Sequence, residues 1–398
     1  MLVIFIAISI IAILLTRGIK LSERITEFSK GAGHKNMLLM VWIFILAGAF
    51  ASSAKAMGAV EATVNLTLAI LPTQFLLAGL FISACIVSLC MGTSVGTIVA
   101  LVPIAATLAD KTDMSVALMT ASIVSGAFFG DNLSFISDTT IVATQSQGCK
   151  PSDKFKYNFF LVLPSAIIVA LLYFFLGSST SEVISAPVLW WKIIPYAAVL
   201  ILATSGMNVM VVLLMGILLT GIVGIADGSY NFMEWTTSLT NGVMGMGELI
   251  LISMMAGGIF ALITYKGVMD RLVQLITSKV RTRKGAELSI CTTVALANVI
   301  TANNTVAILS VGDIAKNIAK RFDIDPRRTA SLLDTTSCTV QGLIPYGAQL
   351  LMASGIAGIS ALSIVPYLYY PMLIGVTVLA TILLPNKKIN INFLIQSL

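Results

Sequence analysis

The sequence predicts an all-α, polytopic membrane protein with two inverted five-helix repeats, discontinuous helices and about 13 crossings. Three observations lead to this fold class: the composition, the recurrence of long apolar runs, and an internal similarity at a constant spacing. Of the 398 residues, 57% are hydrophobic and only 11% are charged, whereas soluble domains carry about 25% charged residues. The composition therefore excludes a soluble globular protein.

Apolar runs long enough to cross about 30 Å of hydrocarbon recur along the whole chain. The first run, "MLVIFIAISIIAILLT", lacks a basic n-region and a small-residue cleavage site. It predicts a retained helix rather than a signal peptide. The predicted crossings lie near residues 1–16, 37–54, 72–90, 94–109, 114–149, 158–177, 189–204, 207–225, 247–265, 286–301, 302–319, 329–358 and 360–384.

The basic residues predict the orientation of these crossings. Only Lys55, Lys111 and Lys192 fall on one side of the topology. All other Lys and Arg residues lie on the opposite side, in loops 17–36, 150–157, 266–285 and 316–328 and in the tail. Because cytoplasmic loops are enriched in basic residues, we expect a multi-pass cell-membrane protein with its N-terminus outside and its C-terminus in the cytoplasm.

The chain also resembles itself at a nearly constant spacing. "GAVE" at 58–61 resembles "GVMD" at 267–270, and 210 residues separate "PIAATLADKTD" (103–113) from "DIAKNIAKRFD" (313–323). Chance similarity between apolar helices is the alternative, but the constant spacing favours duplication. Equivalent helices lie an odd number of crossings apart, so the repeats are inverted, as in secondary transporters that work by alternating access.

The predicted organisation has five parts. They are an N-terminal helix and cytoplasmic loop at 1–36, repeat one at 37–177, a connecting helix pair at 178–246, repeat two at 247–385 and a cytoplasmic tail at 386–398. The five cysteines are scattered without a CxxC pair, so neither a metal cluster nor another cofactor is expected. Membrane lipid and a small cation are the expected partners, nucleic acid is not, and a monomer and a homodimer both stay open.

Two carboxylates interrupt the apolar sequence of the first repeat. "SGAFFGDNLSFISDTT" contains Asp131 and Asp138, the only charges in residues 114–149. A continuous helix over this segment would extend about 54 Å, which exceeds one crossing, and two crossings would move the following lysines outside. We therefore expect one crossing with a break that Gly126 and Gly130 permit. Neighbouring polar side chains can satisfy the freed backbone groups: Asn132, Ser134, Ser137, Thr139 and Thr140.

The second repeat has its own interruption. "LLDTTSCTVQGLIPYGAQ" contains Asp334 as its only charge, and Gly342 and Pro345 mark the break. One helix earlier in each repeat, "MGTSVGT" (91–97) aligns with "TANNTVA" (301–307). Small polar clusters between apolar helices are typical of discontinuous transmembrane helices at ion sites. These clusters contribute Thr93, Ser94, Asn303, Asn304 and Thr305.

A charged Asp at the centre of a membrane helix costs about 2.5–3.5 kcal/mol, so it persists where a proton or a cation compensates it. Carboxylate, hydroxyl and carbonyl oxygens suit hard cations such as sodium. We expect no buried Lys, Arg or His beside these acids, so a transported ion must supply the positive charge. Sodium is expected at Asp131 and Asp138, and Asp334 is expected to join them in ion binding or proton coupling.

Each of these residues has a plainer interpretation. Asp138 and Asp334 both precede two threonines, so either could only cap a helix N-terminus. Asp131 could lie in water at the cytoplasmic end of its helix. The clusters around Ser94 and Asn304 could only satisfy the backbone at a helix break.

The motifs resemble those of the NhaC-type sodium/proton antiporter family. "GAFFGDNLSFISDTT" is similar to its G-A-x-F-G-D-x-x-S-P-x-S-D-T-T signature, and "GTSVGT" to its G-T-S-W-G-T motif. The resemblance covers about 37–385 and implies an ion transporter that moves sodium or lithium out as protons enter. By matching position it implies that Asp131, Asp138 and Asp334 are the acids of the site. Phe135, Val95 and Leu333 depart from the family pattern, which leaves the substrate open more than the fold.

Three functions compete. The first is a sodium or lithium/proton antiporter that uses buried Asp residues and alternating access. The second is an ion-coupled exchanger of small organic acids, of the malate/lactate type, or of amino acids, which would need a basic or helix-N-terminal site for the carboxylate. The third is a membrane-embedded hydrolase with an aspartic dyad, but such an enzyme would not need inverted repeats, so no enzyme activity is expected.

Overall fold

The computed structural model describes residues 2–70, 72–134, 137–177, 187–205, 207–268, 271 and 280–384, and these residues contain helices and no strand. The all-α class predicted from the sequence is confirmed. The predicted tail at 386–398 lies outside the described residues. The first half contains α1 (Leu2–Leu15), α2 (Leu21–Ala32), α3 (Lys35–Met57), α4 (Ala59–Ile70), the 3₁₀ turn η1 (Thr73–Phe75), α5 (Leu76–Met91), α6 (Ser94–Thr112), α7 (Val116–Leu133), α8 (Asp138–Gln147) and α9 (Pro151–Leu176).

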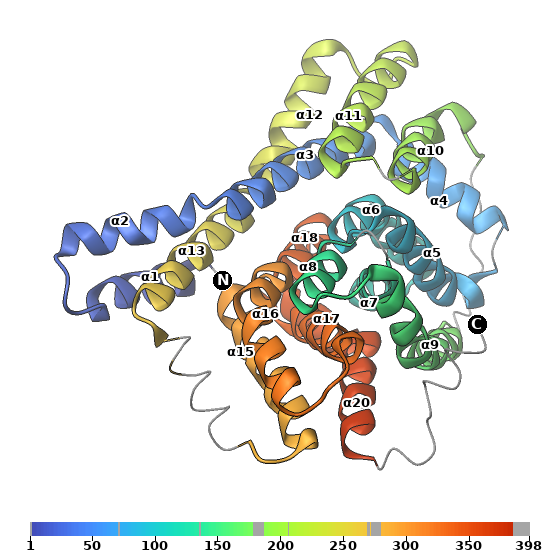
Figure 1. Ribbon diagram of the computed structural model, residues 1–398. Helices are drawn as coiled ribbons and strands as arrows, with labels where there is room; N and C mark the ends of the chain where they lie inside the picture. The colour runs from blue at the N-terminus through green and yellow to red at the C-terminus, as the bar shows by residue number, and fades with distance from the viewer. Residues whose placement is uncertain are drawn as a thin grey trace.

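The second half begins with α10 (Trp190–Thr204), which has no counterpart among the described helices of the first half. It repeats the order of helices from α11 onward, with α11 (Val209–Ala226), α12 (Phe232–Gly245), α13 (Gly247–Tyr265), α15 (Arg283–Thr301), α16 (Asn304–Arg321), α17 (Pro326–Leu343), α18 (Ala348–Ala357), α19 (Ala361–Ile364), the 3₁₀ turn η2 (Val365–Tyr367) and α20 (Tyr369–Leu383). In Figure 1 the helices α5–α9 and α15–α18 form one compact group with α20, and α2, α3, α12 and α13 extend along one side of it.

Six described segments are long and apolar enough to cross a membrane, or up to seven if a bent helix pair counts as one span. The six are Met37–Met57, Ser94–Thr112, Val116–Gln147, Pro151–Leu176, Val209–Ala226 and Phe232–Tyr265. Several other helices are apolar but shorter, because breaks divide the chain into half-length pieces. The span Val116–Gln147 is the interrupted crossing that the two carboxylates predicted.

The helix boundaries recur at a constant spacing, as expected for an internal duplication. The helices α6, α7 and α8 begin at Ser94, Val116 and Asp138, and α16, α17 and α18 each begin 210 residues later, at Asn304, Pro326 and Ala348. The left-handed backbone positions recur at the same spacing, as Gly92 and Ala302, Asp113 and Asp323, and Gly148 and Gly358. A single hydrogen-bond pattern also recurs, since Ser88 Oγ donates to the carbonyl of Ala127 and Asn298 Nδ2 donates to that of Ser337, both at 2.6 Å.

Helices of each repeat also pack against helices of the other repeat. Within each repeat α5 packs on α7 and α15 packs on α17, whereas α6 packs on α18 and α16 packs on α8 of the opposite repeat. The helices α1 and α2 pack on α13 in the same way as α11 and α12 pack on α3 (Figure 1). The duplication therefore extends beyond the predicted repeats at 37–177 and 247–385 and includes these two helix pairs.

The break in the first repeat lies between α7 and α8, after Leu133 and before Asp138. Gly126 and Gly130, which were expected to permit it, instead lie inside α7, where α5 approaches closely. A Cβ at Gly126 would overlap the carbonyl oxygen of Phe81, and one at Gly130 would overlap the side chain of Ser88. The glycines thus serve helix packing, as small residues commonly do in membranes, and the prediction about their role was wrong.

This contact predicts a stability difference between two glycines. Gly130→Ala should separate α5 from α7 and lower the thermal unfolding temperature in detergent, because overpacking a tight contact costs about 1–3 kcal/mol. Gly245→Ala is the matched control, since a Cβ there meets no atom within 4 Å. Equal unfolding temperatures for the two variants would contradict the close packing of α5 on α7.

Candidate functional site

One cavity of about 500 Å³ lies where the breaks of both repeats meet. The tip of the α5–α6 hairpin and the tip of the α15–α16 hairpin contribute to it, as do the starts of α8 and α18. Apolar residues of α3 and of the start of α11, together with Met207 before it, complete its wall. The polar lining residues are Thr93, Ser94, Asp131, Ser137, Asp138, Thr139, Asn208, Asn303, Asn304, Thr305, Gln341 and Gln349.

Asp131 is held at the tip of the first hairpin. Gly92 adopts a left-handed conformation with φ 66° and Thr93 is extended, so α6 starts abruptly at Ser94. The backbone N–H of Ser94 donates to Asp131 Oδ1 at 3.1 Å. Because an unpaired N–H group and the positive end of the helix dipole both favour an anion, the fold positions a carboxylate here that is only 4% exposed.

The second hairpin has the same geometry with a neutral side chain. Ala302 takes the left-handed conformation, and Asn303 caps α16 by accepting a hydrogen bond from Val306 N at 3.0 Å. The residue 210 positions after Asp131 is Gln341, whose Nε2 donates to the carbonyl of Ala302 at 3.0 Å. The two repeats therefore place an acid at one hairpin tip and an amide at the other.

A chain of amides joins the two tips. Gln341 Nε2 also donates to Gln349 Oε1 at 2.8 Å, and Gln349 Nε2 donates to Ser94 Oγ at 3.1 Å. The two glutamines are almost fully buried. The sequence analysis did not select these two glutamines. The repeat spacing of 210 residues makes Gln341 the equivalent of Asp131 and could have identified it.

Asp138 also lines the cavity. It is the first residue of α8 and its side chain is exposed, which agrees with its interpretation as a helix N-terminal acid. Nearby, Ser137 Oγ and Thr139 Oγ1 share a hydrogen bond of 2.8 Å. Asp138 and Asp334 are both electrostatic neighbours of Asp131, so the three acids predicted from the sequence belong to one region.

Three of the predicted residues lie outside the cavity lining. Asn132 and Ser134 are buried at the end of α7, where Asn132 Nδ2 donates to the carbonyl of Phe128 at 2.8 Å. Asp334 is fully buried in α17. Asn132, Ser134 and Asp334 therefore do not line the cavity. The other predicted site residues do line it: Thr93, Ser94, Asp131, Ser137, Asp138, Thr139, Asn303, Asn304 and Thr305.

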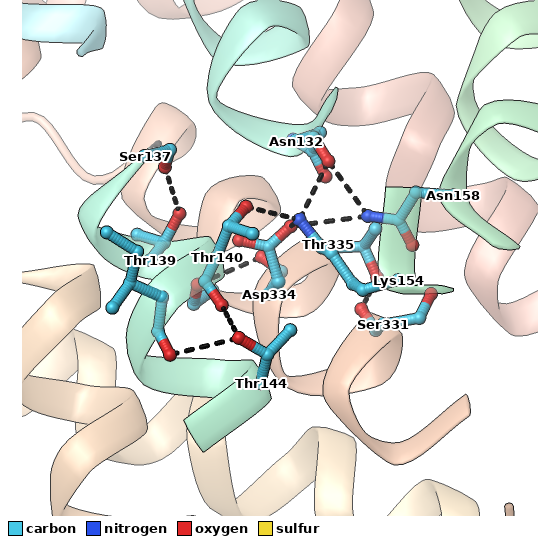
Figure 2. A network of polar contacts seen from close by, with 12 residues as sticks. Asn132, Ser137, Thr139, Thr140, Thr144, Lys154, Asn158, Ser331, Asp334 and Thr335 are labelled. Atoms are coloured by element: carbon cyan, nitrogen blue, oxygen red, sulfur yellow. Dashed lines mark hydrogen bonds and ion pairs between the residues drawn. The ribbon is translucent and has the colours of Figure 1, made fainter. Parts of the chain in front are cut away.

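The expectation that no basic residue lies near the acids was wrong. Lys154, which the sequence placed in a cytoplasmic loop, is only 1% exposed, and its Nζ lies 2.6 Å from Asp334 Oδ2. Figure 2 shows this pair among the polar groups at the break between α7 and α8. The charge that compensates Asp334 therefore comes from the protein itself.

The described residues that line the cavity include two acids and no Lys, Arg or His. Its carboxylate, hydroxyl and amide oxygens form a donor set that suits a hard monovalent cation better than a soft metal ion. The cavity is therefore negative and rich in oxygen ligands. Asp131 combines burial, a position in this lining, and the absence of an ion-pair partner among the described residues that line it.

Similarity to known proteins identifies the family of this chain. A family model described as the Na+/H+ antiporter family matches residues 1–178 and 175–385. The malate-2H(+)/Na(+)-lactate antiporter of Bacillus subtilis is 24% identical over 390 residues, which cover 88% of this chain and 83% of that protein. The Na(+)/H(+) antiporter NhaC of the same organism is 23% identical over 377 residues, covering 85% and 81%.

Among solved structures, the YdaH transporter of Alcanivorax borkumensis matches with a TM-score of 0.46 and 11% identity, over 90% of this chain and 86% of that one. The two family matches together cover nearly all of the chain, and their common boundary near residue 177 falls between the two structural repeats. The chain is an integral membrane protein that belongs to the Na+/H+ antiporter family.

Proposed function

We propose that this protein exchanges sodium or lithium for protons by alternating access, with Asp131 as the carboxylate that binds each in turn. The observation that carries the proposal is the position of Asp131 in an oxygen-lined cavity whose described lining contains no basic side chain. In the exchange step a proton enters the cavity and bonds to the Asp131 carboxylate, and the cation that had compensated this carboxylate leaves. Charge is conserved, because one monovalent cation replaces another.

The cavity supports alternating access because both repeats line it. Residues of the first hairpin face residues of the second, and each hairpin contacts the broken helix of the opposite repeat. Binding sites between repeats of this kind are typical of carriers whose halves rock around a fixed site. An uncompensated carboxylate in a closed, buried site is costly, so the empty carrier resists reorientation and exchange is favoured over leak.

Exchange of a small organic acid is a second candidate, and two observations favour it. A cavity of about 500 Å³ falls in the range of about 300–1,000 Å³ that small-molecule sites occupy, far beyond what a dehydrated sodium ion requires. The starts of α6 and α16 also line it, and helix N-termini attract carboxylates. We place this function second because no basic side chain among the described lining residues would hold the acid.

A single flux experiment separates the two candidates. Purified protein is reconstituted in proteoliposomes with a pH-sensitive dye and an imposed pH gradient, and sodium, lithium, potassium, malate, lactate and amino acids are added in turn. We expect sodium or lithium alone to dissipate the gradient. A gradient that responds only when an organic acid accompanies the cation would reject simple cation/proton exchange in favour of the second candidate.

A further inference from the structure

The Lys154–Asp334 pair connects the two repeats at the break of α7 and α8. Lys154 lies in the first turn of α9, and Asp334 lies midway along α17. Their charged atoms are 2.6 Å apart, and the side chains are 1% and 0% exposed. A buried ion pair of this kind gains little stability over apolar residues of similar volume, because both charges lose their hydration. Its presence therefore calls for a reason other than stability.

Lys154 also holds the broken helix. Its ammonium group donates to the backbone carbonyl of Asn132 at 2.8 Å and to Thr140 Oγ1 at 2.7 Å. Asn158, one turn further along α9, donates to the same carbonyl at 2.9 Å. These contacts, drawn in Figure 2, place a positive charge between the end of α7 and the start of α8, directly behind the cavity.

The symmetry-related location shows that the fold can be built without these charges. At a spacing of 210 residues, Asp334 corresponds to Val124, Lys154 to Ile364, and Asn158 to Leu368. All three apolar counterparts are fully buried, and α7 packs on α19 there as α17 packs on α9 here. The two places thus hold an apolar cluster and an ion pair. The helix that carries Lys154 is continuous, whereas its counterpart is divided into α19, η2 and α20.

Charge counting gives the pair a role in transport. Asp334 is an electrostatic neighbour of Asp131, so its full negative charge would add to that of the transport site. With Lys154 protonated, the two buried acids and the ammonium together carry one net negative charge. One monovalent cation at Asp131 then completes neutrality, whereas two would be required without the lysine.

We propose that Lys154 is the internal counterion of Asp334 and that this fixed charge limits the site to one transported cation at Asp131. The proposal rests on the cation/proton exchange proposed above. It makes Lys154 a positioning residue and removes Asp334 from the set of residues that bind the transported ion. In this scheme the ammonium group takes the place that a second cation would otherwise occupy.

A charge-removal series in proteoliposomes tests this role through the sodium KM of the wild type, Asp334→Asn and Lys154→Gln/Asp334→Asn. In Asp334→Asn the ammonium keeps two acceptors, the Asn132 carbonyl and Thr140 Oγ1, and its uncompensated charge should raise the sodium KM about tenfold. Adding Lys154→Gln should return the KM to within about threefold of wild type, because the net charge is restored. The maximal rate should change less than the KM.

Two results would overturn the proposal: an Asp334→Asn protein with a wild-type KM, or a double variant that folds but is no better than Asp334→Asn. If the amide variants do not fold, Lys154→Ile/Asp334→Val replaces them, since it copies the buried residues of the symmetry-related site. That variant should exchange sodium with a near-wild-type KM, and a folded but inactive protein would count against the proposal. Absence of sodium-driven flux in the wild type would instead reject the function on which it rests.

Discussion

Asp131→Asn should abolish sodium-driven proton flux, with a loss of about a hundredfold or more. The amide oxygen can still accept the hydrogen bond from Ser94 N, so the hairpin tip should keep its shape. The amide neither takes up a proton near neutral pH nor neutralises a cation. The second repeat supports this expectation, because Gln341 already occupies the equivalent position with an intact hairpin beside it. The measurement is dye-reported flux in proteoliposomes over a range of sodium concentrations.

Asp138→Asn is the matched control for this prediction. Asp138 lines the same cavity but is exposed at the start of α8, whereas Asp131 is only 4% exposed. Its loss should reduce flux less than about tenfold and act mainly on the sodium KM. If Asp138→Asn were inactive and Asp131→Asn fully active, the exposed acid would be the exchange site and the role given to Asp131 would be wrong.

Glu287→Ala should destabilise the protein by about 3–5 kcal/mol, because it leaves a buried arginine without its counterion. Arg328 Nη2 lies 2.8 Å from Glu287 Oε2, and Arg328 Nε donates to the same oxygen at 3.1 Å. The pair joins α15 to α17, and Arg328 reaches Thr381 of α20 at 3.0 Å. Thermal unfolding in detergent should show a fall of many degrees.

Glu27→Ala provides the comparison for this loss. Glu27 pairs with Lys30 on the surface of α2 at 2.6 Å, and solvent-exposed ion pairs contribute little to stability. We expect its unfolding temperature to match that of the wild type. If Glu287→Ala also unfolds at the wild-type temperature, other groups must compensate the charge of Arg328.

The elements that the sequence predicted well are those with a local signal. The break between α7 and α8 follows from two carboxylates in an apolar span, and the break between α17 and α18 from Gly342 and Pro345. The hairpin tips follow from small polar residues at Ser94 and Asn304. In each case the residues that interrupt the apolar pattern lie at the break or within a few residues of it, so the sequence contains the signal for the break. The groups that satisfy the freed backbone can come from elsewhere, as Asp131 does for Ser94 N and Lys154 for the Asn132 carbonyl.

Long-range pairing could not be predicted in the same way. Lys154 lies between two other lysines in a polar segment, which is the pattern of a cytoplasmic loop. Its partner Asp334 lies 180 residues further along the chain. Only the packing of α9 against α17 reveals the pair. Gly130 was misinterpreted for a related reason, since glycine serves both helix breaks and close helix contacts, and the neighbouring helix decides between them.

The most direct test of the exchange at Asp131 is proton release when sodium binds to the purified protein. The protein is held in weakly buffered detergent solution with a pH indicator, sodium chloride is added, and choline chloride serves as the salt control. We expect about half a proton to be released per chain at the pH where Asp131 is half protonated, rising toward about one proton below that pH at saturating sodium, and none from Asp131→Asn. Equal proton release from the two proteins would show that another group gives up the proton and would contradict the exchange proposed at Asp131.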